Sequence, residues 1–300
     1  MSLLLPSMFK TLVKQGKVLG PIAADTETSG LHVDDGARIA TVSIAWPVVK
    51  GYTSEYSNLT VEYHADVDRT IASIAWPFDQ GVAGTGKAED NGQTTLWADA
   101  DNLPRKEYEA LLWVLARRFL VMHNAKFDCH QFWAGVRRWP GLGRDLSEQV
   151  IWDTQNGNAQ LYPLLRNPKD KQVTTSLKPS CANLFNEEVQ DEQSKVKEYL
   201  RKKKLPSGRW DLMPWDIIGP YADLDARLTL RLYFRQLQDI ESGSREGNYM
   251  TGPVVVADDA QKMLERRLAI TRLLFKMERR GLPYDAALSR DTATACLLRA

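Results

Sequence analysis

The segment Pro21–Leu31, PIAADTETSGL, changes abruptly from small apolar residues to two carboxylates. Ile22–Ala24 is typical of a buried strand, and Asp25 and Glu27 follow it with a single residue between them. Alternate side chains of a strand lie on the same face, so these two carboxylates are expected side by side. Burial and mutual repulsion both disfavour such a pair unless a cation neutralises it, and carboxylate oxygens suit Mg²⁺ or Mn²⁺. Taken alone, a carboxylate-x-carboxylate pair is more often a solvated turn, so a metal site requires further carboxylates.

The apolar pattern of the remaining chain predicts an α/β layered domain, in which strands come first and helices follow. Two further strands are expected at residues 39–46 and 73–77, around two copies of the sequence SIAWP, and a short strand at 120–122. Apolar residues spaced three and four apart predict helices. The expected helices are residues 104–119, 128–136, 161–165, 177–185, 220–237 and 258–280.

The composition of the 300-residue chain excludes several classes of protein. Apolar residues make up 43% and charged residues 26%, as in ordinary soluble proteins, and the length allows one large domain or two smaller ones. No apolar run approaches the ~20 residues of a membrane span, and the N-terminus lacks the charged start and cleavage site of a secretory signal. The three cysteines form no C-x-x-C pair, which argues against a zinc site or a disulfide framework and favours the cytoplasm.

The charges are unevenly distributed, although the net charge of +1 gives no general argument for nucleic-acid binding. Six cations and one anion lie within Lys195–Lys204, KVKEYLRKKK. Such a run is usually the solvated face of a helix, but clustered cations also provide sequence-independent affinity for phosphates. Arg201–Lys204 is therefore a candidate phosphate contact, and the solvated face remains the alternative.

Two further motifs carry carboxylates at the ends of predicted elements. HNAKFD ends at Asp128 and follows the short strand, and YADLD runs from Tyr221 to Asp225 near the start of a long helix. Tyr221 and Asp225 are four residues apart and share one face of that helix. Each residue has a simpler interpretation by itself: Asp128 as a helix N-cap, Tyr221 as a core aromatic and Asp225 as a surface charge. Together they supply the additional carboxylates that a metal site requires.

The motifs D-x-E, N-x-x-F-D and Y-x-x-x-D, in that order between Asp25 and Asp225, resemble the DEDD superfamily of 3′–5′ exonucleases in its tyrosine-bearing subclass. The closer resemblance is to the proofreading exonuclease domain of family A DNA polymerases, the DNA polymerase I type. It rests on DTET, NAKFD, the DT at Asp153, SLK at Ser176–Lys178 and YADLDARLTL. Glu265–Asp285, ERRLAITRLLFKMERRGLPYD, resembles the segment that opens the polymerase domain in that family. Phage-encoded members often begin directly with the exonuclease, as this chain does.

The resemblance implies an RNase H-like mixed sheet flanked by helices, followed by the start of a helical polymerase region. The expected divisions are an exonuclease domain at residues 1–240, a linker at 241–257 and the truncated start of the polymerase domain at 258–300. The chain would then be the N-terminal portion of a longer polymerase. The implied activity is hydrolysis of DNA from the 3′ end of a single strand or of a frayed primer terminus, away from any membrane, in the cytoplasm of a cell or of a phage host.

The resemblance also implies a role for each matching residue. Four carboxylates would bind two divalent cations, Mg²⁺ or Mn²⁺, which clamp the attacking and leaving oxygens of a phosphoryl displacement: Asp25, Glu27, Asp128 and Asp225. Tyr221 would orient the attacking water, because the ordinary tyrosine pKa of about 10 makes it a poor base. Leu31 would pack against the terminal base, Asn124 would lie beside the substrate strand, and Asp153 would be a structural or supporting carboxylate.

Two residues depart from the family pattern. Gly30 stands where other members often carry a polar residue, which leaves the direction of the neighbouring Leu31 open. Arg227 stands two residues after Asp225, where an acidic residue is common, and it could pair with Asp153 or with a phosphate.

Three other interpretations share part of this pattern. A standalone exonuclease of the RNase D or Werner type has the same four carboxylates but no reason to carry Glu265–Asp285. A non-catalytic DNA-binding scaffold could keep the fold without its carboxylates, whereas all four are present here. A transposase or RNase H type nuclease shares the sheet but would not need Tyr221 four residues before the last aspartate.

Overall fold

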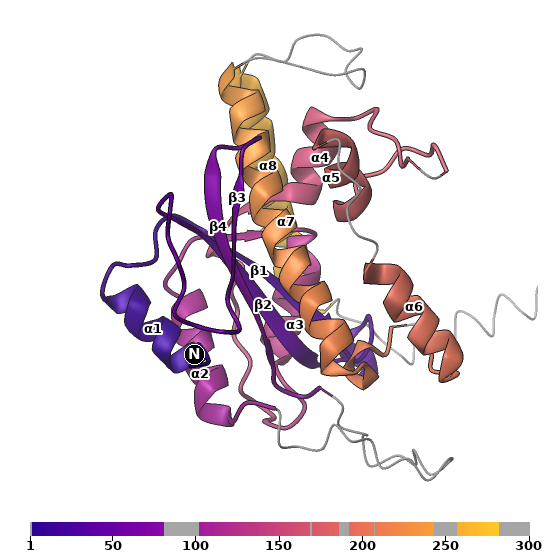
Figure 1. Cartoon of the computed structure of the whole chain (residues 1–300). Helices are drawn as coiled ribbons and strands as arrows, with labels where there is room; N and C mark the ends of the chain where they lie inside the picture. The colour runs from indigo at the N-terminus through magenta and orange to yellow at the C-terminus, as the bar shows by residue number, and fades with distance from the viewer. Residues whose placement is uncertain are drawn as a thin grey trace, which may run out of the picture.

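A six-stranded mixed sheet forms the centre of the molecule, with the strand order β3-β4-β2-β1-β5-β6 (Figure 1). The computed structural model describes residues 2–80, 102–168, 170–185, 192–206, 208–242 and 257–281. Nearly all of the expected linker at 241–257, and the part of the expected polymerase start after residue 281, lie outside the described residues. The strands are β1 (Ile22–Thr28), β2 (Ile39–Val48), β3 (Thr60–His64), β4 (Arg69–Pro77), β5 (Leu120–Met122) and β6 (Val150–Asp153).

The strands pair in both directions because two kinds of connection join them. β1 pairs antiparallel with β2, β2 with β4, and β4 with β3, and no helix of three turns or more separates these strands in the described chain. β1, β5 and β6 pair parallel, with helices between them in the sequence, as parallel neighbours require. The two copies of SIAWP lie opposite one another, with Ile44 paired to Ile74.

Three helices cover one face of the sheet: α1 (Pro6–Lys14), α2 (Arg105–Leu115) and α3 (Ala125–Ala134) (Figure 1). Large aromatic side chains fill the space between these helices and the strands. Fully buried examples are Phe9, Trp76, Tyr108 and Phe132. Each buried side chain of this size contributes ~1.5–3 kcal/mol relative to exposure, so this layer is the main hydrophobic core.

The long helix α7 (Trp215–Ser242) covers the other face of the sheet. Small residues lie at the contact, among them Ala23 and Ala45 of the strands and Ala226 of α7, and they allow the helix to approach closely. Because Ala23 faces α7, the alternation of β1 directs Asp25 and Glu27 to the same side. The alternation places the carboxylate pair beneath α7.

The remaining helices lie around α7 and the β6 edge of the sheet. α4 (Thr154–Leu161), α5 (Leu177–Leu184) and α6 (Glu192–Lys202) pack against α7, and α8 (Ala257–Arg280) packs against β6, α3 and α4 (Figure 1). Leu268 and Phe275 of α8 are buried in the main core. The Arg272 guanidinium donates to the backbone carbonyl of Ser147 at 3.1 Å. Among the described helices, none combines the length and the apolar character needed to cross a membrane.

The α/β class and the mixed sheet flanked by helices were predicted correctly, whereas several element boundaries were wrong. The helix expected at 161–165 is instead α4, which ends at Leu161, and α1, β3 and β6 were not predicted. α7 begins at Trp215 rather than at Pro220, which lies inside the helix. Proline removes one backbone hydrogen bond there, but Trp215 and Ile218 join an apolar cluster with α6 that stabilises the first turns.

Candidate metal centre

Three of the four predicted metal ligands lie together between β1 and α7. Asp25, Glu27 and Asp225 each present a carboxylate oxygen, and these three oxygens lie within 4.8 Å of one another. The strand supplies two of them from one face, and α7, held close by the small residues of the sheet, supplies the third. Glu27 and Asp225 are buried, whereas Asp25 is partly exposed, which leaves the cluster in contact with solvent on one side.

The electrostatics of this cluster strongly disfavour three ionised carboxylates. Burial, followed by the charge of Asp225, raises the pKa of Asp25 to about 7. Burial, followed by the charges of Asp25 and Asp225, raises the pKa of Glu27 well above its usual range. Burial also raises the pKa of Asp225. A divalent cation would relieve both the repulsion and the desolvation, and three oxygen donors at this spacing suit Mg²⁺ or Mn²⁺.

Tyr221 lies one helical turn before Asp225 on the same face of α7, and its hydroxyl hydrogen-bonds to the Asp225 carboxylate. The ring is buried and stacks on Trp210 of the short helix η2 (Trp210–Leu212), with the ring centroids 5.3 Å apart. Burial, followed by the charge of Asp225, raises the Tyr221 pKa above its usual range. The phenol therefore stays protonated at neutral pH, where it can orient a neighbouring group but cannot act as a base.

Lys178 is a member of the site to which the sequence analysis gave no role. Its ammonium nitrogen lies 2.9 Å from Oδ1 of Asp225 and 3.3 Å from the centroid of the Tyr221 ring. Its charge lowers the pKa of Asp25, Glu27 and Asp225, against the larger effect of burial. The sequence signal was the SLK motif, which supported the family resemblance but did not show that the lysine reaches the carboxylates.

Asp128 is not part of the group of three, because it approaches β1 from the other face of the sheet. Thr26 lies between Asp25 and Glu27 and points away from α7, and its hydroxyl donates to Oδ1 of Asp128 at 2.7 Å. Asp128 itself is buried on α3. Burial, followed by the charge of Asp25, raises its pKa well above the usual range. Asp128 is thus electrostatically linked to the cluster without being one of its grouped ligands.

The three secondary residues of the prediction occupy different positions. The Leu31 side chain is 66% exposed, and Asn124 is exposed at the start of α3 with a left-handed backbone, φ 65°. Asp153 is buried and accepts hydrogen bonds from the backbone N–H groups of Asn124 at 3.1 Å and Gln155 at 2.9 Å. It therefore joins the start of α3 to the start of α4.

Arg227 does not pair with Asp153. Its guanidinium lies 2.9 Å from Glu62 of β3 and 4.0 Å from Asp223, one turn earlier on α7. The arginine thus ties α7 to the edge of the sheet. The pairing with Asp153 that the sequence suggested is therefore wrong, since backbone N–H groups bind that carboxylate, whereas a contact with a phosphate stays a prediction.

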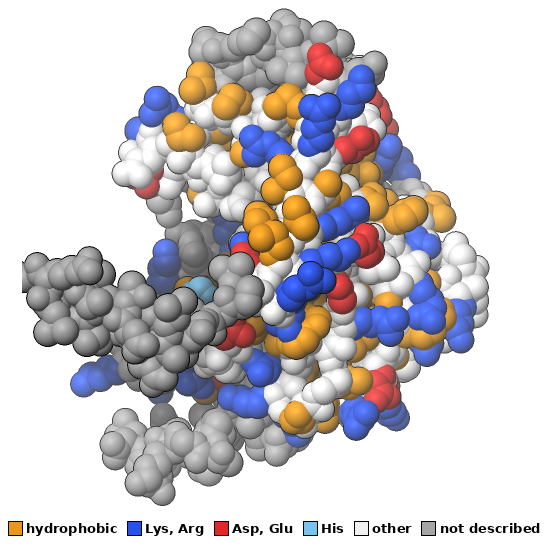
Figure 2. Space-filling model, turned by 180° about the vertical axis from the view of Figure 1, so that it is seen from behind, with side chains coloured by type: hydrophobic (Ala, Val, Ile, Leu, Met, Phe, Trp, Pro, Cys, Tyr) orange, Lys and Arg blue, Asp and Glu red, His pale blue; other side chains and the backbone are white. Residues whose placement is uncertain are grey.

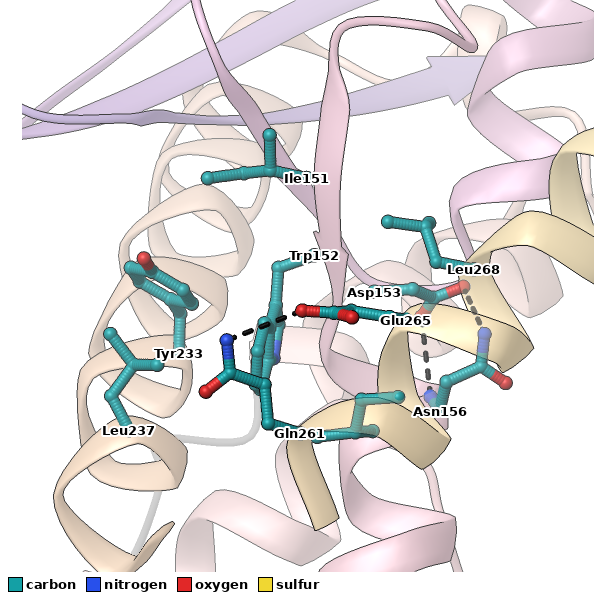
Figure 3. A pocket seen from close by; sticks show the side chains of 10 residues that line it. Ile151, Trp152, Asp153, Asn156, Tyr233, Leu237, Gln261, Glu265 and Leu268 are labelled. Carbon is teal, nitrogen blue, oxygen red and sulfur yellow. Dashed lines mark hydrogen bonds between the residues drawn. The ribbon is translucent and has the colours of Figure 1, made fainter. Parts of the chain in front are cut away.

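A pocket of about 230 Å³ lies away from the carboxylate cluster, between β6, α4, α7 and α8 (Figure 3). Tyr233 and Leu237 of α7 line it, two to three turns after Asp225, together with Trp152 and with Glu265 of α8. It shares none of the three grouped carboxylates. The pocket is therefore separate from the carboxylate cluster.

Comparisons with known proteins add little to this geometry. No protein-family model matches the chain, and no curated protein matches it. Among solved structures, the chain is similar to one described as the apo form of the nuclease, with 15% identity over 91% of this chain and 92% of that chain. The TM-score is 0.46, so this similarity carries no conclusion about activity.

Proposed function

We propose that the chain is a 3′–5′ exonuclease that hydrolyses DNA phosphodiesters with divalent cations, as the proofreading domain of a family A DNA polymerase. The observation that carries this proposal is the grouping of Asp25, Glu27 and Asp225, with Tyr221 hydrogen-bonded to the last of them. These residues come from separate motifs of the sequence. Their arrangement in one partly open cluster supports the metal-dependent chemistry that the motifs imply.

The residues of the cluster have distinct roles in this proposal. Asp25, Glu27 and Asp225 hold Mg²⁺ or Mn²⁺, and Asp128, which is hydrogen-bonded to Thr26 and lies outside this group in the structure, is the proposed fourth ligand when the ions are bound. Two such ions, when bound, stabilise the charge on the attacking and leaving oxygens of the phosphodiester. The Tyr221 hydroxyl orients the attacking water, which its position beside Asp225 and its protonated state support.

We assign contact with the end of the substrate to two exposed residues, Leu31 and Asn124. Leu31 follows β1 by three residues and presents an exposed apolar side chain, which suits packing against the terminal base. Asn124 is exposed at the start of α3, and its side-chain amide is proposed to lie beside the bound DNA strand. The expected partner is the 3′ end of single-stranded DNA or a frayed primer terminus, in a cytoplasmic setting.

We assign residues 1–240 to the exonuclease domain, 241–257 to a linker and 258–300 to the start of a polymerase domain. α8 carries a row of exposed apolar side chains on the side away from the sheet: Met263, Ile270, Leu273, Leu274 and Met277. Figure 2 shows hydrophobic side chains interspersed with lysines and arginines on this face of the molecule. An apolar row of this kind is typical of a surface that further protein covers.

The direct test is digestion of single-stranded DNA labelled at either end, with Mg²⁺ or with EDTA, and with an RNA control. We expect shortening from the 3′ end of DNA that requires the metal, and no primer extension. Preference for RNA would favour the standalone exonuclease of the RNase D type. DNA binding without any cleavage would favour the non-catalytic scaffold, and primer extension would contradict the domain assignment.

A further inference from the structure

Lys178 is placed in the carboxylate cluster by packing. It lies on α5, whose residues Leu177 and Cys181 pack with Leu228 and Leu232 of α7 in a small apolar cluster. The lysine side chain is only 15% exposed. An ammonium this deeply buried needs a charged partner, and the cluster of acids supplies it.

The contact between Lys178 and Asp225 is a close ion pair. The ammonium nitrogen lies 2.9 Å from Oδ1 of Asp225, and this contact lowers the pKa of that carboxylate against the effect of burial. The same ammonium lies 3.3 Å from the centroid of the Tyr221 ring, which attracts it through the negative face of the ring. Lys178 therefore has two attractive neighbours and could leave one while keeping the other.

We propose that Lys178 is an internal counter-cation of the cluster, which competes with a divalent cation for Asp225 and remains against the Tyr221 ring when that cation binds. The inference rests on the proposed function, since it assumes that the cluster binds metal. Two cations beside one carboxylate oxygen repel each other, so metal binding at Asp225 requires the ammonium to withdraw. Held by the tyrosine ring, the ammonium stays beside the group that orients the water and can neutralise charge on the phosphate.

The first test measures metal binding without any substrate. Calorimetric titration with Mn²⁺ compares the full chain with Lys178→Met, which keeps the length of the side chain and removes its charge. We expect roughly tenfold tighter Mn²⁺ binding in the variant, because the competing cation is gone. Lys178→Arg keeps the charge and should bind Mn²⁺ as the unchanged protein does. Equal or weaker Mn²⁺ binding by a folded Lys178→Met would overturn the proposal.

The matched control is Lys276→Met, because Lys276 is 53% exposed and pairs with Glu148 on the α8 side of the molecule. It loses the same charge without touching the cluster, so its Mn²⁺ affinity should not change. If Lys178→Met does not fold, Lys178→Gln with the same titration replaces it, and unchanged affinity in that variant also contradicts the proposal. Circular dichroism of each variant before titration establishes which case applies.

The second test separates metal demand from turnover. In Lys178→Met, the Mn²⁺ concentration for half-maximal DNA cleavage should fall roughly tenfold, while kcat at saturating Mn²⁺ should fall about tenfold to a hundredfold. Loss of a lysine with a purely structural role would not lower both the Mn²⁺ concentration for half-maximal cleavage and kcat. If the unchanged protein binds Mn²⁺ but cleaves no DNA, the proposed function fails while the titration still decides the role of Lys178. If it binds no Mn²⁺ at all, both proposals fail.

Discussion

Asp25 shows how a single residue of the site opposes the stability of the fold. Its pKa is raised from 3.8 to about 7, so between these pH values the folded protein keeps a proton that the unfolded chain has lost. Without metal, the Asp25 contribution to the free energy of unfolding must therefore decrease as pH rises from ~4 to ~7. A bound cation would remove this loss of stability at neutral pH, because it stabilises the ionised form of Asp25.

The first prediction uses Asp25→Asn to measure this cost. In EDTA, the variant should unfold with nearly the same free energy as the unchanged protein at pH 4, and with about 1–3 kcal/mol more at pH 8. The pKa shift itself sets an upper limit of ~4 kcal/mol. Urea titrations at both pH values provide the measurement. If the free energies of unfolding of the two proteins changed with pH in the same way, Asp25 would ionise in the folded protein as it does in the unfolded chain, and the prediction would be wrong. Adding Mn²⁺ should stabilise the unchanged protein more than the variant.

A second prediction separates ligands from positioning groups. Asp25→Ala combined with Glu27→Ala should abolish cleavage at any metal concentration and weaken Mn²⁺ binding, while the fold survives because two repelling carboxylates are removed. Tyr221→Phe keeps the ring against Trp210 and loses only the hydroxyl. Its cleavage rate should fall by roughly 10²–10⁴ with little change in metal affinity. Full activity in Tyr221→Phe would make the tyrosine a packing residue.

Local periodicity predicted two pairs of neighbouring residues in the site, whereas the family resemblance implied that the two pairs meet. Alternation along β1 placed Asp25 and Glu27 together, and the four-residue spacing on α7 placed Tyr221 beside Asp225. Lys178 could not be found in this way, because its approach depends on how α5 packs against α7. The position of Asp128 on the far side of β1 likewise depends on α3, and no spacing within the chain specifies it.

At the scale of elements, the errors of the sequence analysis share one cause, which is that tertiary packing overrides local signals. Pro220 is a typical helix-start residue, but it lies inside α7 because the turns before it pack against α6. β6 has only four residues, too few for a recognisable alternation of apolar and polar residues, and its pairing with β5 defines it as a strand. In contrast, α8 was predicted to within one residue at its start, and it ends before Gly281 with φ 72°.

The basic end of α6 carries the third prediction. Val196 and Leu200 of α6 pack with Tyr221, so this helix flanks the site, and Arg201–Lys204 are exposed at its end. Replacing these four residues with glutamine should weaken binding of single-stranded DNA and reduce the salt dependence by ~0.7 of a log unit per lost phosphate contact. Turnover at saturating DNA should hardly change.

The control for this change is Lys106→Gln, an exposed lysine on α2, which lies on the opposite face of the sheet. It should leave the salt slope unchanged. An unchanged slope in the α6 variant as well would identify Arg201–Lys204 as a solvated helix face. Fluorescence anisotropy at several salt concentrations measures both variants.

At the scale of the whole molecule, α8, which we assign to the start of a polymerase domain, packs against the sheet domain. α8 makes side-chain contacts with several elements, including an ion pair of Glu278 with Lys126 and a hydrogen bond between Glu278 and His130 of α3, each at 2.7 Å. Its buried and exposed sides differ sharply: Phe275 is 1% exposed, whereas the neighbouring Leu273 is 57% exposed. The described part of α8 is therefore packed as part of the folded unit of the sheet.

The last prediction tests this attachment with two substitutions on the same helix. Phe275→Ala removes a ring that packs in the main core and lies 4.8 Å from the His130 ring, so it should lower the free energy of unfolding by about 3–5 kcal/mol. Leu273→Ala removes a side chain that faces outward, so its effect should stay within ~0.5 kcal/mol. Urea unfolding of the full chain, followed by circular dichroism, measures both. Equal effects of the two substitutions would show that α8 does not dock on the sheet domain in solution, and the unit would then end with α7.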